Sequence, residues 1–262
     1  MRNLKKFYLG LMLLFMYAPI VVLIAFSFNE SRSRGYWGGF TLDWYIELFH
    51  DKRIMKALYN TVVIALLSSA IATVIGTIAS IGINGLSKAS RNVVMNITNL
   101  PVLNPDIVTG VSLMILYISV FKILGLGQLG FMTLLISHVT FNIPYVILSV
   151  LPKLRQLDKN LYEAALDLGA SPLFAFFKVV LPEIMPGIVT GAIFAFTLSI
   201  DDFVISFFTT GSGVSNLSVI VYSMARRGVN PKINALSTLM FVAVLALLYL
   251  INKRDASKLK ES

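Results

Sequence analysis

Residues 152–187 of the chain read PKLRQLDKNLYEAALDLGASPLFAFFKVVLPEIMPG and join two long apolar runs. The segment predicts a helix, a sharp turn and a second helix, because Gly169 is suited to end one helix and Ser171-Pro172 to begin the next. We expect the second helix to end near Leu181-Pro182. Apolar residues form helical stripes along both: Leu161, Ala164, Ala165, Leu168, Leu173, Phe174, Phe177 and Val180. The segment is therefore too apolar to extend freely into water.

The composition of the 262 residues indicates a chain embedded in lipid. Hydrophobic residues make up 56% and charged residues 13% of the sequence, and the mean hydropathy is +0.79. A soluble domain carries roughly 25% charged residues, so about half of the usual charge is missing. We therefore expect an all-α, polytopic membrane protein. The absence of cysteine excludes disulfides, thiolate metal sites and a cysteine nucleophile.

Six stretches are apolar enough to cross a bilayer, which takes about 20 residues. They are 7–28, 61–83, 93–121, 131–151, 184–209 and 233–251. The third is overlong and broken near its middle by the residues LPVLNP at 100–105. The first resembles a signal peptide with small residues at 25–27, but it exceeds the apolar region of about 7–15 residues that signal peptides have. We expect an uncleaved first span.

The net charge of +9 comes from basic residues that cluster between the apolar runs, which favours a topogenic role over nucleic-acid binding. With the N-terminus in the cytoplasm, the cytoplasmic segments hold thirteen of the 22 Lys and Arg residues, leaving nine on the opposite side. The thirteen are Arg2, Lys5, Lys6, Lys88, Arg91, Lys153, Arg155, Lys159, Lys178, Lys253, Arg254, Lys258 and Lys260. Six spans then leave both termini in the cytoplasm.

The long outer loop contains a short amphipathic segment, FTLDWYIELF at 40–49. Thr41 is placed to cap a helix there, and Asp43 favours its positive end. Trp44 and Tyr45 suit the boundary between lipid and water. We expect a short helix that lies at the membrane interface.

The cytoplasmic segment resembles a motif of the permease subunits of ATP-binding-cassette importers, E-A-A-x3-G-x9-I-x-L-P. The chain has Glu163-Ala164-Ala165, then Gly169, then Val179, Leu181 and Pro182 at the required spacing. Val179 in place of Ile is the only departure, and it is conservative in shape. Without this resemblance, a helical hairpin that packs on its own bundle would explain the segment equally well.

The resemblance implies a type I importer fold and a division of labour between subunits. Glu163, Ala164, Ala165, Gly169 and Ser171 would form the turn that couples to a separate ATPase subunit. The chain would be no enzyme, because it lacks a G-x-x-x-x-G-K-[ST] phosphate loop and its nearest approach, at 82–88, lacks the Gly-Lys pair. ATP and Mg would be used by the ATPase, so we expect no cofactor in this chain. The implied partners are two ATPase subunits, a paralogous permease and an extracytoplasmic substrate-binding protein, in a bacterial cell membrane.

The implied organisation has three parts. Residues 1–59 hold the first transmembrane helix and the outer loop with its interfacial helix. Residues 60–251 form the permease domain, including the coupling loop at 153–183, and residues 252–262 form a basic cytoplasmic tail.

Within the family, the likeness is strongest to the second permease subunit of spermidine/putrescine importers, in the segments 39–61, 99–106, 137–145 and 199–202. An importer for another small solute, such as iron, sulfate or another anion, stays open as an alternative. An anion pathway would favour basic side chains or helix N-termini. A gradient-driven secondary transporter is the remaining alternative, but it would not need the coupling motif.

Three acids lie within predicted spans: Asp106, Asp201 and Asp202. An ionised carboxylate in a bilayer is energetically costly, so such residues usually mark a pathway. At 1.5 Å per residue, Asp106 and Asp201 lie at similar depth, roughly 20–25 Å from the cytoplasmic side. Neighbouring helical residues point about 100° apart, so we expect at most one of Asp201 and Asp202 to face the pathway squarely. Either one could instead pair with a neighbouring helix or cap a kink.

Aromatic residues of the fourth predicted span could join this pathway. Phe141 and Tyr145 are suited to hold alkylammonium groups by cation–π contact. His138 is better explained as a packing residue than as a ligand. Since no second His and no Cys lies near it in the sequence, we expect no metal site.

The topology can be tested with single cysteines, since the chain has none of its own. A cysteine at Ser31 should react with an impermeant thiol reagent from outside, and one at Ser257 should react only after the membrane is opened. The opposite pattern would overturn the assignment of six spans with both ends inside.

Overall fold

A computed structural model describes residues 2–31, 36–125, 127–211, 213–227, 231–242 and 245. In this part of the chain the elements are helices, with one isolated antiparallel bridge between Asn29 and Phe40. The chain divides into two compact units, Met1–Met55 with Ile220–Ser262, and Lys56–Val219.

The first unit contains α1 (Arg2–Phe26) and α2 (Asp43–His50). The predicted short helix in the outer loop is confirmed as α2, but its predicted cap is wrong by one residue. Leu42 is the N-cap, and the Thr41 hydroxyl accepts a hydrogen bond from the backbone N–H of Asp43 at 3.1 Å. The buried Trp44 ties α2 to the end of the preceding segment by donating its indole N–H to the carbonyl of Asn29 at 2.8 Å.

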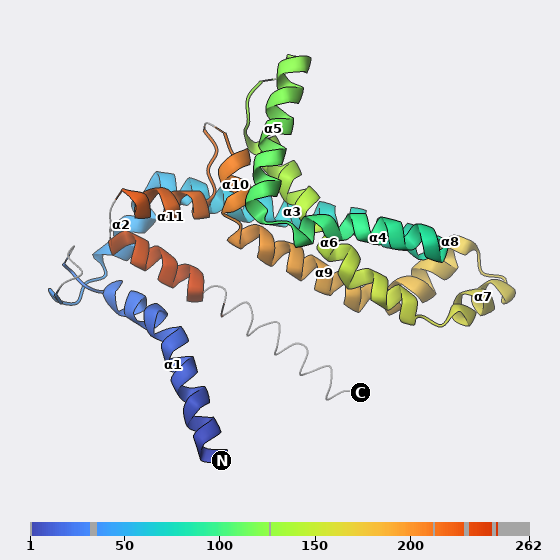
Figure 1. Cartoon of the computed structure of the whole chain (residues 1–262), viewed down its shortest axis with the longest axis horizontal. Coiled ribbons are helices and arrows are strands. Elements are labelled where there is room, and N and C mark those ends of the chain that lie inside the picture. Colours follow the sequence, from blue (N-terminus) through green and yellow to red (C-terminus); the bar gives the residue numbers. More distant parts are fainter. Residues whose placement is uncertain are drawn as a thin grey trace. The chain divides into compact units, whose positions relative to one another are not determined.

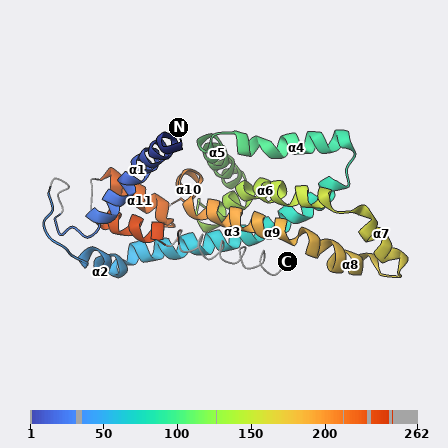
Figure 2. The ribbon, with the colours of Figure 1, turned by 90° about the horizontal axis from the view of Figure 1, so that it is seen from below.

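In chain order the elements from here on are α3 (Lys52–Asn84), α4 (Lys88–Leu103), α5 (Asp106–Leu124), α6 (Phe131–Gln156), α7 (Lys159–Asp167), α8 (Pro172–Ala175), the π-helix η1 (Phe176–Val180), α9 (Leu181–Asp201), α10 (Val204–Thr209) and α11 (Leu217–Arg226). The second unit holds most of α3 and the helices from α4 to α10, whereas most of α11 belongs to the first unit (Figure 1). In both views α9 runs beside α6 and α3, while α5 stands steeply across them (Figure 2). The short α10 packs against α5 and α6.

In the part of the chain that the structure describes, five helical stretches are long and apolar enough to cross a membrane: Lys5–Phe26, Lys52–Asn84, Asp106–Leu124, Phe131–Gln156 and Pro172–Asp201. Each overlaps one of the first five predicted spans. The predicted break in the third is confirmed, because α4 ends at Leu103 and α5 begins at Asp106. The sixth prediction, 233–251, lies partly outside the described residues.

Two predictions about the fifth span and the helix before it are wrong. The second helix of the cytoplasmic segment does not end near Leu181-Pro182, because α8, η1 and α9 follow one another without a gap. Proline has no N–H for the ladder, and the wider π turn just before it, in which the N–H of Leu181 reaches the carbonyl of Phe176, accommodates the missing bond. The fifth span is not continuous to residue 209 either, since α9 stops at Asp201.

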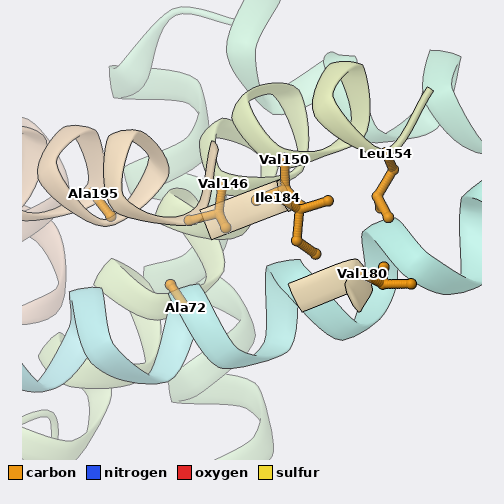
Figure 3. Packing of buried hydrophobic residues seen from close by; sticks show 7 residues of the cluster. All are labelled: Ala72, Val146, Val150, Leu154, Val180, Ile184 and Ala195. Carbon is orange, nitrogen blue, oxygen red and sulfur yellow. The ribbon is translucent and has the colours of Figure 1, made fainter. Parts of the chain in front are cut away.

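The packing of α6 against α9 is apolar and close. Buried residues from α3, α6, η1 and α9 form one cluster (Figure 3): Ala72, Val146, Val150, Leu154, Val180, Ile184 and Ala195. Beside it, Gly187 and Gly191 lie one turn apart on α9 and face α6. A methyl group on Gly187 would lie 2.9 Å from the carbonyl oxygen of Ser149, and one on Gly191 would lie 3.2 Å from the Cα of Val146. This small-xxx-small spacing lets the two backbones approach, as at other membrane helix pairs.

Replacing Gly187 with Ala should therefore push α6 and α9 apart. We expect a loss of about 1–3 kcal/mol, which is typical of overpacking a close contact. Gly82→Ala is the matched control, because a methyl group there meets nothing within 4 Å and helical Gly→Ala gains up to about 1 kcal/mol. Thermal unfolding in detergent measures both; a Gly187 variant as stable as the Gly82 variant would contradict the close contact.

Candidate functional site

A pocket of about 290 Å³ lies where α5, α6, α9 and α10 meet. Its lining residues are Asp106, Phe141, Thr197, Leu198, Asp201, Asp202, Phe203 and Val204. Asp106 is the first residue of α5 and Asp201 the last of α9, so two helix ends bring these acids together. Both residues are exposed in this single chain.

The electrostatics of the pocket favour a cation. The two carboxylates supply negative charge, and the C-terminal end of α9 adds the negative end of a helix dipole. No Lys or Arg is among the lining residues. An arriving positive charge would thus meet carboxylates and the negative end of a helix dipole together.

The two predicted aromatic residues lie on α6 next to this pocket. Phe141 lines it, whereas Tyr145 is outside the lining and one turn further along the helix. Their ring centroids are 5.4 Å apart in an edge-to-face arrangement. The Phe141 ring is thus held in place by a second ring, which suits a cation–π contact.

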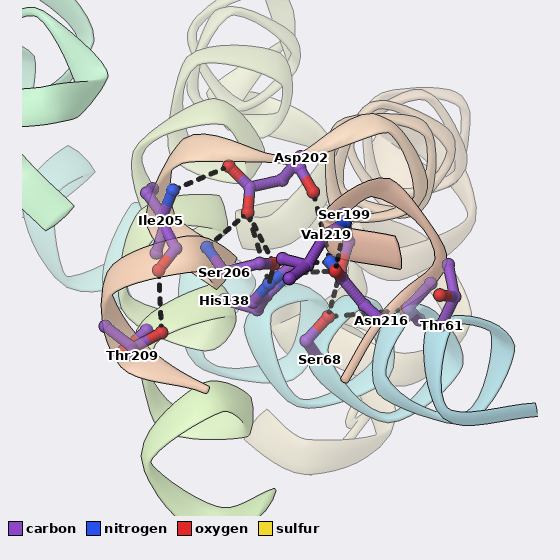
Figure 4. Close-up of polar contacts among 12 residues, drawn as sticks. Thr61, Ser68, His138, Ser199, Asp202, Ile205, Ser206, Thr209, Asn216 and Val219 are labelled. Atoms are coloured by element: carbon purple, nitrogen blue, oxygen red, sulfur yellow. Dashed lines mark hydrogen bonds and ion pairs between the residues drawn. The ribbon is translucent and has the colours of Figure 1, made fainter. Parts of the chain in front are cut away.

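Asp202 behaves differently from Asp201. Its side chain is only 7% exposed, and its carboxylate accepts hydrogen bonds from the N–H of Ile205 at 3.2 Å and from the N–H and hydroxyl of Ser206, each at 2.7 Å (Figure 4). These bonds satisfy backbone donors at the start of α10. Asp202 therefore caps the break that the sequence did not predict between α9 and α10.

His138 lies beneath this cap with a side chain that is 2% exposed. Its Nδ1 is 2.6 Å from the hydroxyl of Ser199, its Nε2 is 2.9 Å from that of Ser206, and Nε2 lies 3.5 Å from the carboxylate of Asp202. Every polar atom of the ring has a partner from the protein itself. Among the described residues no group of three or more His, Asp or Glu side chains comes together as a metal site.

Several polar residues around His138 were not predicted from the sequence. Ser68 on α3 lies 3.0 Å from Ser199, and the amide of Asn216 donates to the carbonyl of Asp202 at 3.1 Å and to the hydroxyl of Ser206 at 2.6 Å. The available signal was the presence of small polar residues inside apolar spans, which often pair across helices in membranes. This signal identifies residues that could form hydrogen bonds between helices, but it does not predict which of them pair with one another.

The coupling turn predicted at Gly169 is formed by α7 and α8. Gly169 has a φ of +86°, the N–H of Ala170 reaches the carbonyl of Ala165 at 3.1 Å, and the N–H of Gly169 reaches that of Leu166 at 2.9 Å. These two bonds define a Schellman motif. Ser171 then caps α8 by accepting from the N–H of Phe174 at 3.3 Å.

Most side chains around this turn are exposed to solvent in the isolated chain. Glu163 and Ala164 are exposed and Ala165 is half-buried on α7. Large apolar side chains beside them are also uncovered, with Leu168 89% and Leu173 72% exposed. The turn thus presents apolar side chains beside two exposed acids, Glu163 and Asp167, and an exposed apolar surface is typical of a protein contact.

The chain matches known transport proteins over most of its length. Residues 72–253 match the family described as "Binding-protein-dependent transport system inner membrane component". The putrescine transport system permease protein PotI of Escherichia coli K12 is 41% identical over 233 residues, 88% of this chain and 83% of the relative. The spermidine/putrescine transport system permease protein PotC of the same strain is 38% identical over 233 residues, 89% and 86% of the two chains.

A solved structure shows the same fold. A chain of a bacterial ABC transporter that imports the acidic polysaccharide alginate superposes with a TM-score of 0.73 at 19% identity, covering 98% of this chain and 97% of that one. The all-α, multi-pass fold is thus that of an ABC-importer membrane domain, and transport components of this kind are not enzymes. With more than half of its residues matched to the family, this chain belongs to the inner membrane components of binding-protein-dependent transport systems.

Proposed function

We propose that the chain is a permease subunit of an ATP-driven importer for polyamines such as putrescine and spermidine. The observation that carries the proposal is the pocket in which Asp106 and Asp201 from two helix ends lie with Phe141. The names of the two relatives from Escherichia coli support the same substrate class.

A polyamine is an apolar chain with ammonium groups, and the pocket offers a match for both parts. The carboxylates of Asp106 and Asp201 would replace water around an ammonium group, with charge-assisted contacts that are stronger than neutral ones. The ring of Phe141 would contact the methylene chain or an ammonium group. An anion would meet two carboxylates and no basic side chain in the same lining, which argues against the sulfate and other anion alternatives.

The pocket is small because one permease would form only part of the pathway. Its volume of about 290 Å³ is at the low end of ligand pockets, which run from about 300 to 1,000 Å³. A second, related permease subunit would supply the facing wall. The family's dependence on a binding protein supports an extracytoplasmic partner that delivers the substrate.

The energy of ATP hydrolysis would be transmitted to this chain at the turn between α7 and α8. We assign Glu163, Ala164, Ala165, Gly169 and Ser171 to the contact with one of two ATPase subunits, which would bind ATP and Mg. In this proposal the turn and both chain termini would lie in the cytoplasm, which the distribution of basic residues supports. The exposed apolar side chains beside Gly169 support a protein partner there.

Replacing Asp106 or Asp201 with Asn tests the substrate assignment. Asn keeps the shape and removes the charge, so each variant should lower uptake of labelled spermidine about tenfold per inserted complex, in keeping with the loss of a hydrogen bond to a charged group. Asp43→Asn, which removes an exposed acid outside the pocket, should transport normally. Wild-type uptake by both pocket variants would overturn the polyamine assignment.

Replacing Gly169 tests the coupling turn. Val is a poor fit for a φ of +86° and also adds bulk, so Gly169→Val should abolish transport and loosen the ATPase while the chain still inserts. Gly169→Asn separates the two effects, because Asn tolerates the left-handed conformation but adds a side chain. We expect Asn to lower the stimulated ATPase activity as well. Normal coupling in the Asn variant would show that only the backbone turn matters, and normal transport by the Val variant would refute the assignment.

A further inference from the structure

The break between α9 and α10 decides where the two adjacent acids point. Asp201 is the last residue of α9 and lies exposed in the pocket, whereas the backbone of Asp202 is extended, with ψ at 124°. Asp202 also borders the pocket, but its carboxylate is bonded to the start of α10 and its side chain is 7% exposed. Because the residues are neighbours, any change that releases Asp202 also reorients Asp201.

His138 joins the helices on both sides of this break. Its Nδ1 contacts Ser199 on α9, before the break, and its Nε2 contacts Ser206 on α10, after it (Figure 4). The three residues are buried, with 2% exposure or less. The imidazole is therefore a clamp across the break, at 2.6 and 2.9 Å.

Counting donors and acceptors assigns the protons of this clamp. The carboxylate of Asp202 can only accept, so the Ser206 hydroxyl donates its single proton there, at 2.7 Å. Ser206 Oγ must then accept from both His138 Nε2–H and the amide of Asn216, which uses its two lone pairs. His138 thus donates from Nε2, and in the neutral ring Nδ1 accepts from Ser199. The clamp is directional and fully satisfied.

A neighbouring hydroxyl belongs to the same network but to neither arm of the clamp. Ser68 on α3 lies 3.0 Å from the hydroxyl of Ser199. Ser68 is as buried as Ser199 and Ser206. It provides a comparison residue, since its loss removes a buried hydroxyl of the same network and leaves both arms of the clamp intact.

We infer that His138 is a positioning residue for the pocket: by clamping Ser199 to Ser206 across the α9–α10 break, it keeps Asp202 on the cap of α10 and Asp201 in the pocket with Asp106. Asp202 then serves the break and not the substrate. The role of Asp201 toward a cation rests on the proposed function, but the clamp itself does not.

A cysteine in place of Asp201 reports the position of this residue without any substrate. This cysteine is the reporter, and the measured quantity is the rate at which it reacts with a cationic thiol reagent in the purified, assembled complex. His138→Leu and Ser199→Ala should lower the rate by about fivefold, the effect of losing one buried hydrogen bond. His138→Gln keeps one donor and one acceptor, and Ser68→Ala leaves the clamp intact. Both variants should therefore react at about the rate of the chain that carries only the cysteine at position 201.

A second measurement uses the chain with its native Asp201. His138→Leu and Ser199→Ala should raise the apparent KM for spermidine uptake about fivefold, by the same loss of one hydrogen bond, with little change in the maximal rate per complex. A role in folding alone predicts less complex with an unchanged KM. If His138→Leu fails to assemble, the pair Ser199→Ala and Ser68→Ala still decides the question.

Two outcomes overturn the inference: an unchanged reporter rate in both clamp variants, or equal effects of Ser199→Ala and Ser68→Ala. Failure of the polyamine proposal has a different signature. In that case Asp106→Asn and Asp201→Asn leave spermidine uptake unchanged, while the reporter rate still responds to the loss of the clamp.

Discussion

A helix can stop inside a membrane only where other groups take over its backbone hydrogen bonds, since lipid offers none. At the α9–α10 break that work is done by the carboxylate of Asp202, which accepts from two backbone N–H groups of α10. Buried side chains of α6 and the loop before α11 hold the carboxylate and its neighbour Ser206 in place. The geometry of the pocket depends on this arrangement, because it ends α9 at Asp201.

Asp106, on the other side of the pocket, is positioned by a second helix break, the one between α4 and α5. This break is stabilised by a proline and not by a capping carboxylate. Between α4 and α5 the chain passes through Asn104 and Pro105, and proline has no N–H that would be left without a partner. Asp106 follows directly and sits at the positive end of α5, which stabilises its charge. One acid therefore lies where the helix dipole favours it, and the other where the dipole would favour a cation instead.

Much of the fold could be predicted because it follows from local pattern. Run length and hydropathy identified five described spans, and Gly169, Ser171 and Pro172 correctly predicted the turn between α7 and α8, since glycine and capping residues act through their own backbone. The α9–α10 break could not be placed, because apolar periodicity continues through it and a cap is defined by which N–H groups it meets. The sequence left open whether Asp201 or Asp202 capped a kink, and only the tertiary contacts of His138 and Ser206 distinguish them. The close contact at Gly187 and Gly191 was missed for the same reason, as it depends on the facing backbone of α6.

The uninterrupted run from Pro172 to Asp201 has a mechanical consequence. It spans 30 residues, or about 45 Å at 1.5 Å per residue, with the turn at Gly169 next to one end and Asp201 at the other. The glycine contact with α6 lies between these ends, and the π-helix Phe176–Val180 lies near the turn. When the run from Pro172 to Asp201 tilts as one body about the glycine contact, a small movement of the turn displaces Asp201 in the opposite direction. The same helix that positions the pocket would thereby open or close it.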